Sequence, residues 1–208
     1  MISGINPLGL IRRKDAFDDP DWVFELKHDG FRALAYVDAE RCRLVSRNQH
    51  RFDEFDALAK AIAKDLAERR AVIDGEVVCL DAEGRSRFYE LLARKGRPYY
   101  YAFDLLWLDG EDLRDRPLLE RKAKLRELVP EKDSRLLYVD HIEASGIAFL
   151  ERVCEMDIEG IIAKRKKGLY REGTTWYKIK NAAYSQAEGR GELFDRRRSR
   201  PGSTPEDS

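Results

Sequence analysis

The sequence predicts an α+β domain built from mostly antiparallel sheets with flanking helices. Short strand-like segments follow one another at hairpin spacing, and segments with apolar residues every three or four positions lie between them. The chain has 208 residues, of which 43% are hydrophobic and 10% aromatic. This length and composition suit one globular domain with a substantial core.

The first three strands are expected at residues 22–27, 31–37 and 41–47. Asp29-Gly30 separates the first two, which predicts a tight hairpin turn. Lys27 ends the first apolar run, so a hairpin would hold its amine on rigid backbone. Taken alone, the same pattern also describes an ordinary surface lysine beside a turn.

The remaining elements alternate between helix and strand. A helix that opens at Asp53 carries one apolar stripe, formed by Phe55, Leu58, Ile62 and Leu66. Ser86 and Ser145 are expected to cap helices at 86–95 and 145–156, and Pro117 to open a helix that ends before Pro130. The later strands are expected at 71–80, 98–108, 136–142, 158–165 and 175–179.

We expect three regions along the chain: an extended lead-in over 1–20, a folded domain over 21–184, and a polar basic tail over 185–208. Apolar periodicity ends after Tyr184, and the tail contains Arg196-Arg197-Arg198 among Gly, Pro and Ser. Such a composition need not pack, which predicts disorder. The arginine run would either contact DNA or only solubilise the end of the chain.

Charge and cysteine content restrict the function classes. The chain has 39 basic and 39 acidic residues, so a polyanionic partner is indicated only by local clustering, as between Lys164 and Lys180, where seven Lys or Arg face one acid. Three cysteines far apart argue against a disulfide framework or a cysteine-rich metal site. No segment approaches a membrane span or a signal peptide, so we expect a cytoplasmic protein without a membrane partner.

Polar insertions interrupt several of the expected strands. They are Ser46-Arg47-Asn48, Asp74-Gly75-Glu76, the Glu159 and Lys164 pair around an apolar run, and Lys178 with Lys180. Each also has an ordinary structural interpretation: a bulge, a helix–strand junction, or an edge strand protected by lysines. Together they suit a nucleotide, because lysines neutralise phosphate and carboxylates are ligands that Mg²⁺ prefers. Phe103 would then stack on a purine, or else pack in the core.

In this order the motifs resemble the six nucleotidyltransferase motifs of ATP-dependent DNA ligases and their mRNA-capping relatives. The motif residues are Lys27-x-Asp29-Gly30-x-Arg32, Ser46-Arg47-Asn48, Asp74-Gly75-Glu76, Phe103-Asp104, Glu159-Gly160 and Lys178-x-Lys180. The resemblance runs from about residue 20 to 183 and is closest to the ligase modules of bacterial end-joining enzymes. It implies an ATP-grasp-like adenylation domain, with two antiparallel sheets and the nucleotide in the cleft between them.

The resemblance also implies roles for individual residues. Lys27 would attack ATP and carry AMP, with Lys178 and Lys180 as further catalytic residues. Glu25 would contact the adenine amine and Phe103 would stack on its ring. Arg32, Arg47 and Glu76 would fix the ribose and the substrate phosphate, and Lys164 would contact phosphate. Glu76 and Glu159 would hold Mg²⁺. The expected nucleotide-binding residues are thus Glu25, Lys27, Arg32, Arg47, Glu76, Phe103, Lys164, Lys178 and Lys180.

The implied function is ATP-dependent nick sealing in DNA repair and recombination, on nicked double-stranded DNA. Such ligases normally continue into an OB-fold domain, and the two dozen residues after Tyr184 are too few for a five-stranded barrel. We therefore expect that domain to be absent, with a slow first step or a separate DNA-binding or end-joining partner. The alternatives are an RNA ligase, a capping-type guanylyltransferase, and a non-catalytic module that binds nucleotide or DNA.

Overall fold

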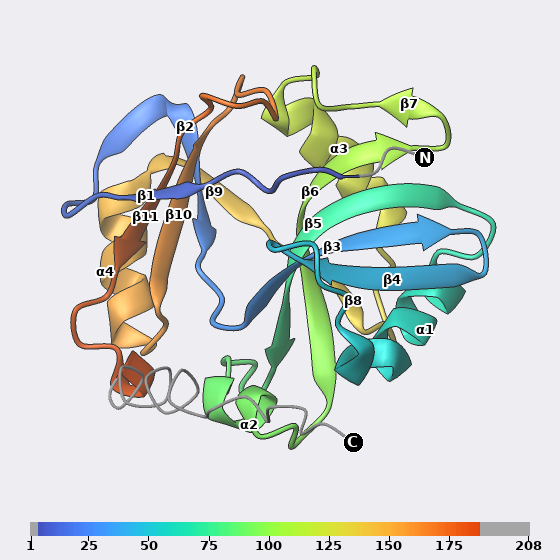
Figure 1. The fold of residues 1–208 in the computed structure, drawn as a ribbon. Helices are drawn as coiled ribbons and strands as arrows, with labels where there is room; N and C mark the ends of the chain where they lie inside the picture. Colours follow the sequence, from blue (N-terminus) through green and yellow to red (C-terminus); the bar gives the residue numbers. More distant parts are fainter. Residues whose placement is uncertain (1–3, 188–208) are drawn as a thin grey trace, which may run out of the picture.

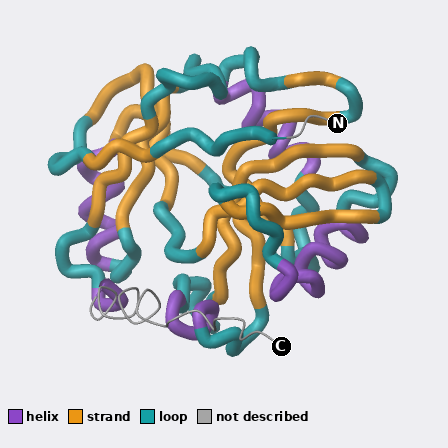
Figure 2. Tube along the Cα trace, in the orientation of Figure 1, coloured by secondary structure: helices purple, strands orange, loops and turns teal. Residues whose placement is uncertain are grey.

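Two β-sheets form the body of the molecule, and helices cover their outer faces (Figure 1). The computed structural model describes residues 4–187. Figure 2 shows the strands gathered into two groups that face each other across the middle of the molecule. The predicted fold class, α+β with two mostly antiparallel sheets, is confirmed.

The first sheet has five strands in the order β1-β11-β10-β2-β9. Its strands are β1 (Leu10–Arg12), β2 (Asp18–Leu26), β9 (His141–Ser145), β10 (Gly160–Arg165) and β11 (Trp176–Lys180). All neighbours are antiparallel except β1 and β11, which run parallel.

The second sheet has six strands, with β4-β3-β5-β6-β7 in order and β8 paired with β6. Its strands are β3 (Phe31–Asp38), β4 (Arg41–Ser46), β5 (Arg70–Cys79), β6 (Pro98–Leu108), β7 (Glu111–Asp112) and β8 (Leu136–Tyr138). Only the β6–β8 pair is parallel.

Four α-helices complete the fold of residues 4–187. They are α1 (Asp56–Asp65), α2 (Phe88–Leu92), α3 (Leu118–Leu128) and α4 (Gly146–Glu155), with 3-10 turns at Asp53–Phe55 and Ser185–Ala187. Helix α4 packs on the first sheet through Val153, and α1 and α3 pack on the second through residues such as Ile62 and Leu125.

Strand alternation divides the apolar residues into three clusters. In β10, Ile161 and Ala163 face α4, whereas Ile162 faces a cluster between the two sheets that also contains Trp176 and Leu34. One face of each sheet therefore packs on helices, while the other contributes side chains to the space between the sheets.

The expected hairpin around Asp29-Gly30 is wrong. Strands β2 and β3 do not pair with each other, since β2 belongs to the first sheet and β3 to the second. Residues 27–30 instead carry the chain from one sheet to the other. Gly30 is needed because a Cβ there would lie 2.0 Å from the carbonyl oxygen of Val77.

Three smaller expectations also need correction. The strand expected at 136–142 divides into β8 and β9, which lie in different sheets. Neither Ser86 nor Ser145 makes a side-chain cap. The first turn of α4 is instead satisfied by Asp18, whose Oδ1 accepts a hydrogen bond from the Ile147 backbone at 2.9 Å.

The structure shows pairing and hydrogen bonds on the outer side of the predicted boundaries at residues 20 and 185. The lead-in contributes β1 to the first sheet, and β2 already begins at Asp18. At the other end Ser185 donates a backbone hydrogen bond to Asp157, and Gln186 bonds to the Ser86 carbonyl. The run Arg196-Arg197-Arg198 and the disorder predicted for residues 188–208 concern a part of the chain that lies outside the described residues.

Candidate active site

A cleft between the sheets collects side chains from seven strands and from the 27–30 crossover. Six of the predicted site residues line it: Glu25, Lys27, Arg32, Glu76, Phe103 and Lys164. Leu10, Leu26, His28, Ile162 and Trp176 complete the lining. The sequence motifs, spread over more than 130 residues, therefore meet at one place.

Lys27 lies where the chain leaves the first sheet. Its backbone amide donates to the Gly160 carbonyl at 2.9 Å, which fixes the main chain beside β10. Its Nζ lies 2.6 Å from Glu159 Oε2, and Lys180 Nζ lies 2.9 Å from the other oxygen of the same carboxylate. We call Lys27, Glu76, Glu159 and Lys180 the lysine end of the cleft.

Glu76 is the second carboxylate at the lysine end. Burial raises its pKa to about 7; Lys27 and Arg32 lower it and Glu159 adds to the rise. Across residues 4–187 no group of three or more His, Cys, Asp or Glu side chains is arranged to hold a metal. Two carboxylates still suit Mg²⁺, which commonly binds through one or two carboxylates and completes its shell with substrate phosphates and water.

The other end of the cleft is buried and aromatic. Glu25 receives a different lysine at each carboxylate oxygen: Lys122 Nζ is 2.6 Å from Oε1 and Lys164 Nζ is 2.5 Å from Oε2. Lys164 Nζ also lies 4.1 Å from the Trp176 ring centre and 4.5 Å from that of Phe103. We call these five residues the aromatic end.

The charges of the aromatic end are coupled. Burial acts to raise the pKa of Glu25, but Lys122 and Lys164 outweigh it, so the net pKa is lowered. Burial lowers the pKa of Lys164, and Lys122 lowers it further. Lys164, which was expected to contact phosphate, lies against two rings and Glu25.

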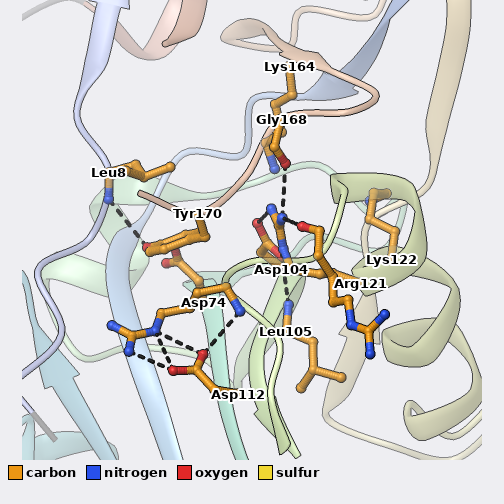
Figure 3. A network of polar contacts seen from close by, with 12 residues as sticks. Leu8, Asp74, Asp104, Leu105, Asp112, Arg121, Lys122, Lys164, Gly168 and Tyr170 are labelled. Atoms are coloured by element: carbon orange, nitrogen blue, oxygen red, sulfur yellow. Dashed lines mark hydrogen bonds and ion pairs between the residues drawn. The ribbon is translucent and has the colours of Figure 1, made fainter. Parts of the chain in front are cut away.

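Arg32 connects the cleft floor to a polar network. Its guanidinium forms two bonds to Asp74, at 3.1 and 2.7 Å, and a third to the Leu8 carbonyl at 2.5 Å. The Tyr170 hydroxyl donates to Asp74 at 2.7 Å and accepts from the Leu8 amide (Figure 3). Burial lowers the pKa of Arg32, but Asp74 raises it by more, so its net pKa is raised.

A second network lies beside the first. Arg121 binds both oxygens of Asp104 at 2.7 Å and donates to the carbonyls of Arg116 and Gly168 (Figure 3). Both partners are fully buried. The network ties α3 and β6 to the loop that carries Tyr170.

Four predicted residues are not part of the cleft lining: Arg47, Glu159, Lys178 and Lys180. Glu159 and Lys180 are linked to it through the ion pair of Glu159 with Lys27. Arg47 is exposed at the end of β4, and Lys178 is half-buried on the same face of β11 as Trp176 and Lys180. The basic patch expected between Lys164 and Lys180 is also partly neutralised: Lys166 pairs with Glu143 and Arg171 with Asp115.

Lys122 and Tyr184 were missed by sequence reasoning. Lys122 and Arg121 occupy the positions between Leu118 and Leu125 on the buried stripe of α3, at i+3 and i+4. Charges on an apolar stripe are the signal that would have revealed them. The Tyr184 hydroxyl donates a hydrogen bond to Asp29 at 2.9 Å and so supports the crossover. No sequence pattern predicts this contact.

His28, in the crossover, stacks on Tyr101 with ring centres 3.8 Å apart. Burial lowers its pKa to about 4, and Lys27 adds to this effect. A ring held neutral beside Lys27 adds no positive charge to the lysine end at neutral pH.

Comparison with known proteins identifies the family. Residues 13–180 match the model of the ATP dependent DNA ligase domain. The chain belongs to the ATP-dependent DNA ligase domain family. The multifunctional non-homologous end joining protein LigD of Pseudomonas aeruginosa is 37% identical over 169 residues, which cover 77% of this chain and 20% of LigD. A DNA ligase of Thermococcus onnurineus is 31% identical over 179 residues, covering 76% of this chain and 32% of that protein.

Solved structures agree with this family. The ligase domain of Mycobacterium tuberculosis LigD superimposes with a TM-score of 0.73 at 30% identity, covering 84% of this chain and 59% of that domain. A mycobacterial DNA ligase D complexed with ATP and MES gives the same values. The chain thus spans a fifth to a third of the curated relatives it matches. Between residues 4 and 187 no helix is long and apolar enough to cross a membrane.

Proposed function

We propose that this ligase-family chain is the adenylating unit of an ATP-dependent DNA ligase, with Lys27 as the nucleophile. The observation that carries this proposal is the position of the Lys27 amine, which is paired with Glu159 in the cleft that Glu76 and the aromatic end also line. A lysine on rigid backbone in such a cleft can form a covalent intermediate.

In the first step the Lys27 nitrogen attacks the α-phosphorus of ATP. A nitrogen–phosphorus bond forms, the bond from the α-phosphorus to the bridging oxygen breaks, and pyrophosphate leaves. The amine must leave its ion pair with Glu159 and lose a proton before it attacks. Lys180, on the other oxygen of Glu159, and Lys178 lie on the β11 face where they can meet the phosphates.

The base of ATP fits the aromatic end. Glu25, held as a carboxylate, can only accept hydrogen bonds, which suits the exocyclic amine of adenine. Phe103 offers a ring for stacking. Arg32, fixed by Asp74, and Glu76 also line the cleft and would hold the ribose and substrate phosphate.

Glu76 and Glu159 would hold Mg²⁺ at the lysine end. When bound, the ion supplies positive charge against the phosphate oxygens. In the later steps AMP passes from Lys27 to a 5′-phosphate at a nick, and the 3′-hydroxyl then displaces AMP. Membership of the ligase family, and LigD relatives named for end joining, support DNA repair as the setting and an end-joining partner or further domain for duplex binding.

Intact mass after incubation with ATP and Mg²⁺ tests the proposal. The expected result is an increase by one AMP that is absent from Lys27→Ala. A parallel incubation with GTP tests for capping chemistry, which would give a GMP adduct. Sealing of a nicked DNA duplex, compared with joining of single-stranded RNA ends, distinguishes a DNA ligase from an RNA ligase. If the Lys27→Ala variant still acquires AMP, Lys27 is not the nucleophile. If wild type acquires none and cannot seal a pre-adenylated nick, the catalytic proposal fails.

A further inference from the structure

The aromatic end contains one more lysine than pairing with Glu25 requires. Lys122, Lys164 and Glu25 are each at most 2% exposed, so two buried amines share one carboxylate. Asp104, a further carboxylate that acts on both lysines, is already bound at both oxygens by Arg121. Lys164 alone would neutralise Glu25, so neutralisation does not explain Lys122.

Lys122 has a second polar contact besides Glu25, a backbone carbonyl. It projects from α3, and its Nζ donates to Glu25 at 2.6 Å and to the Val139 carbonyl at 2.8 Å. The same Nζ lies 4.6 Å from the Tyr138 ring centre. Val139 belongs to the segment that crosses from β8 in one sheet to β9 in the other. Lys122 therefore fixes the Glu25 carboxylate relative to both sheets.

Lys122 does not line the cleft; of its two hydrogen-bond partners, Glu25 lines it and Val139 does not, so Lys122 would act on a ligand through Glu25. A buried ion in excess of pairing is costly, and an apolar side chain of the same length would commonly serve stability as well or better. A role in positioning Glu25 explains why a lysine is present at this buried site despite its energetic cost. With one oxygen held by Lys122 and the other by Lys164, the lone pairs left on Glu25 point in fixed directions.

We propose that Lys122 is a positioning residue that sets the base selectivity of the cleft, by fixing Glu25 as an acceptor for the amine of adenine. The inference rests on the proposed function, because it requires Glu25 to read the base. Guanine presents a carbonyl oxygen where adenine has this amine, so a fixed carboxylate repels it. A carboxylate released on one side can rotate, and it then discriminates less.

The test is equilibrium binding of the α,β-methylene analogues of ATP and GTP, which cannot transfer their nucleotide, to the full chain. Lys122→Met should weaken binding of the adenine analogue about 10- to 100-fold, the range expected for a hydrogen bond to a charged group. Binding of the guanine analogue should change less than about threefold, so the selectivity ratio falls. Lys122→Arg, which keeps a charged donor, should restore part of the ratio.

Lys124→Met is the matched control, since Lys124 lies on the same helix but is exposed and pairs only at 3.4 Å with Glu111. It should leave both dissociation constants unchanged. If Lys122→Met fails to fold, Lys122→Gln replaces it with the same expected fall in the ratio. Circular dichroism and urea unfolding report whether each variant is folded.

Two outcomes would overturn the inference separately from the function. A folded Lys122 variant with wild-type selectivity, or with equal weakening of both analogues, gives Lys122 a merely structural role while wild type still forms its AMP adduct. Wild type that binds neither analogue and forms no adduct contradicts the proposed function itself, and the inference with it.

Discussion

The two ends of the cleft differ in how completely folding has enclosed their charges. At the aromatic end Glu25 and its two lysines are 1–2% exposed, and each carboxylate oxygen already has a partner. At the lysine end the side chains of Lys27 and Lys180 are 18% and 42% exposed and share the single carboxylate of Glu159. The first end is assembled when the protein folds, whereas the second can exchange partners with a substrate.

This difference separates two tasks. A buried, fully paired carboxylate keeps its direction and suits recognition of a base. The lysine-end pairs are less enclosed, because Lys27 and Lys180 reach solvent although Glu159 is only 5% exposed, and this suits groups that must move during the reaction. Substitutions at the two ends should therefore fail in different ways.

The largest effect is expected at the lysine end from Lys27→Arg. Arginine keeps the positive charge beside Glu159, but its guanidinium stays protonated and cannot attack phosphorus. We expect no AMP adduct by intact mass and a free energy of unfolding within about 1 kcal/mol of wild type. An adduct on the variant would move the nucleophile to another residue.

The next largest effect is expected in the network beside the aromatic end, from Arg121→Met. The substitution leaves Asp104 buried without its partner, so the free energy of unfolding should fall by about 3–5 kcal/mol. Urea unfolding measures the loss. Arg114→Met removes a surface pair with Asp112 and should cost less than about 1 kcal/mol. Equal losses in the two variants would contradict the distinction between enclosed and exposed pairs.

A smaller effect is expected from His28, between the two ends. Its pKa is about 4 in the folded protein and near 6.5 when unfolded, so only the unfolded chain takes up a proton between these values. Stability from this group is therefore present above pH 6.5 and lost as the pH falls towards 4. Because the ring is partly exposed, we expect a loss of about 1–2 kcal/mol, less than the full shift implies.

His28→Phe keeps a ring against Tyr101 and removes the titration. Unfolding of this variant and of wild type should be compared at pH 4 and pH 7, with exposed His50→Asn as the control. The difference between the two pH values should shrink only in His28→Phe. The same pH dependence in wild type and His28→Phe would show that His28 takes up its proton equally in both states.

The smallest effect on folding is expected from Lys180→Met. Lys180 is exposed and forms one ion pair, so its loss should change the free energy of unfolding by less than about 1 kcal/mol. Addition of salt should reduce even this difference, because exposed charges are screened. A loss comparable with that of Arg121→Met would place Lys180 among the enclosed charges.

Sequence patterns predicted the strands and helices well because most of them follow simple apolar periodicity. The hairpin at Asp29-Gly30 failed because turn chemistry describes only local backbone. Whether β2 pairs with β3 depends on which sheet each strand joins. Here β2 pairs with β10 in the first sheet, and β3 pairs with β5 in the second. The same limitation hid the division of 136–142 between the two sheets.

The lysine end was predictable and the aromatic end only in part. Lys27, Glu76 and Glu159 stand out because each interrupts an apolar run, and the fold brings them together. The sequence analysis did not single out Lys122 or Arg121, since charged residues on a helix are usually exposed. Only their partners, Glu25 and Asp104 on distant strands, explain their burial.

The most direct test of this division of tasks is the rate of AMP-adduct formation as a function of ATP concentration, in single turnovers of Glu25→Gln and Glu159→Gln. The aromatic-end variant should need about tenfold more ATP for its half-maximal rate, while its saturating rate stays within about threefold of wild type. The lysine-end variant should lose saturating rate while its half-maximal ATP concentration stays near that of wild type, because Glu159 contacts the attacking amine rather than the base. Both variants losing rate and ATP affinity in equal measure would contradict the account.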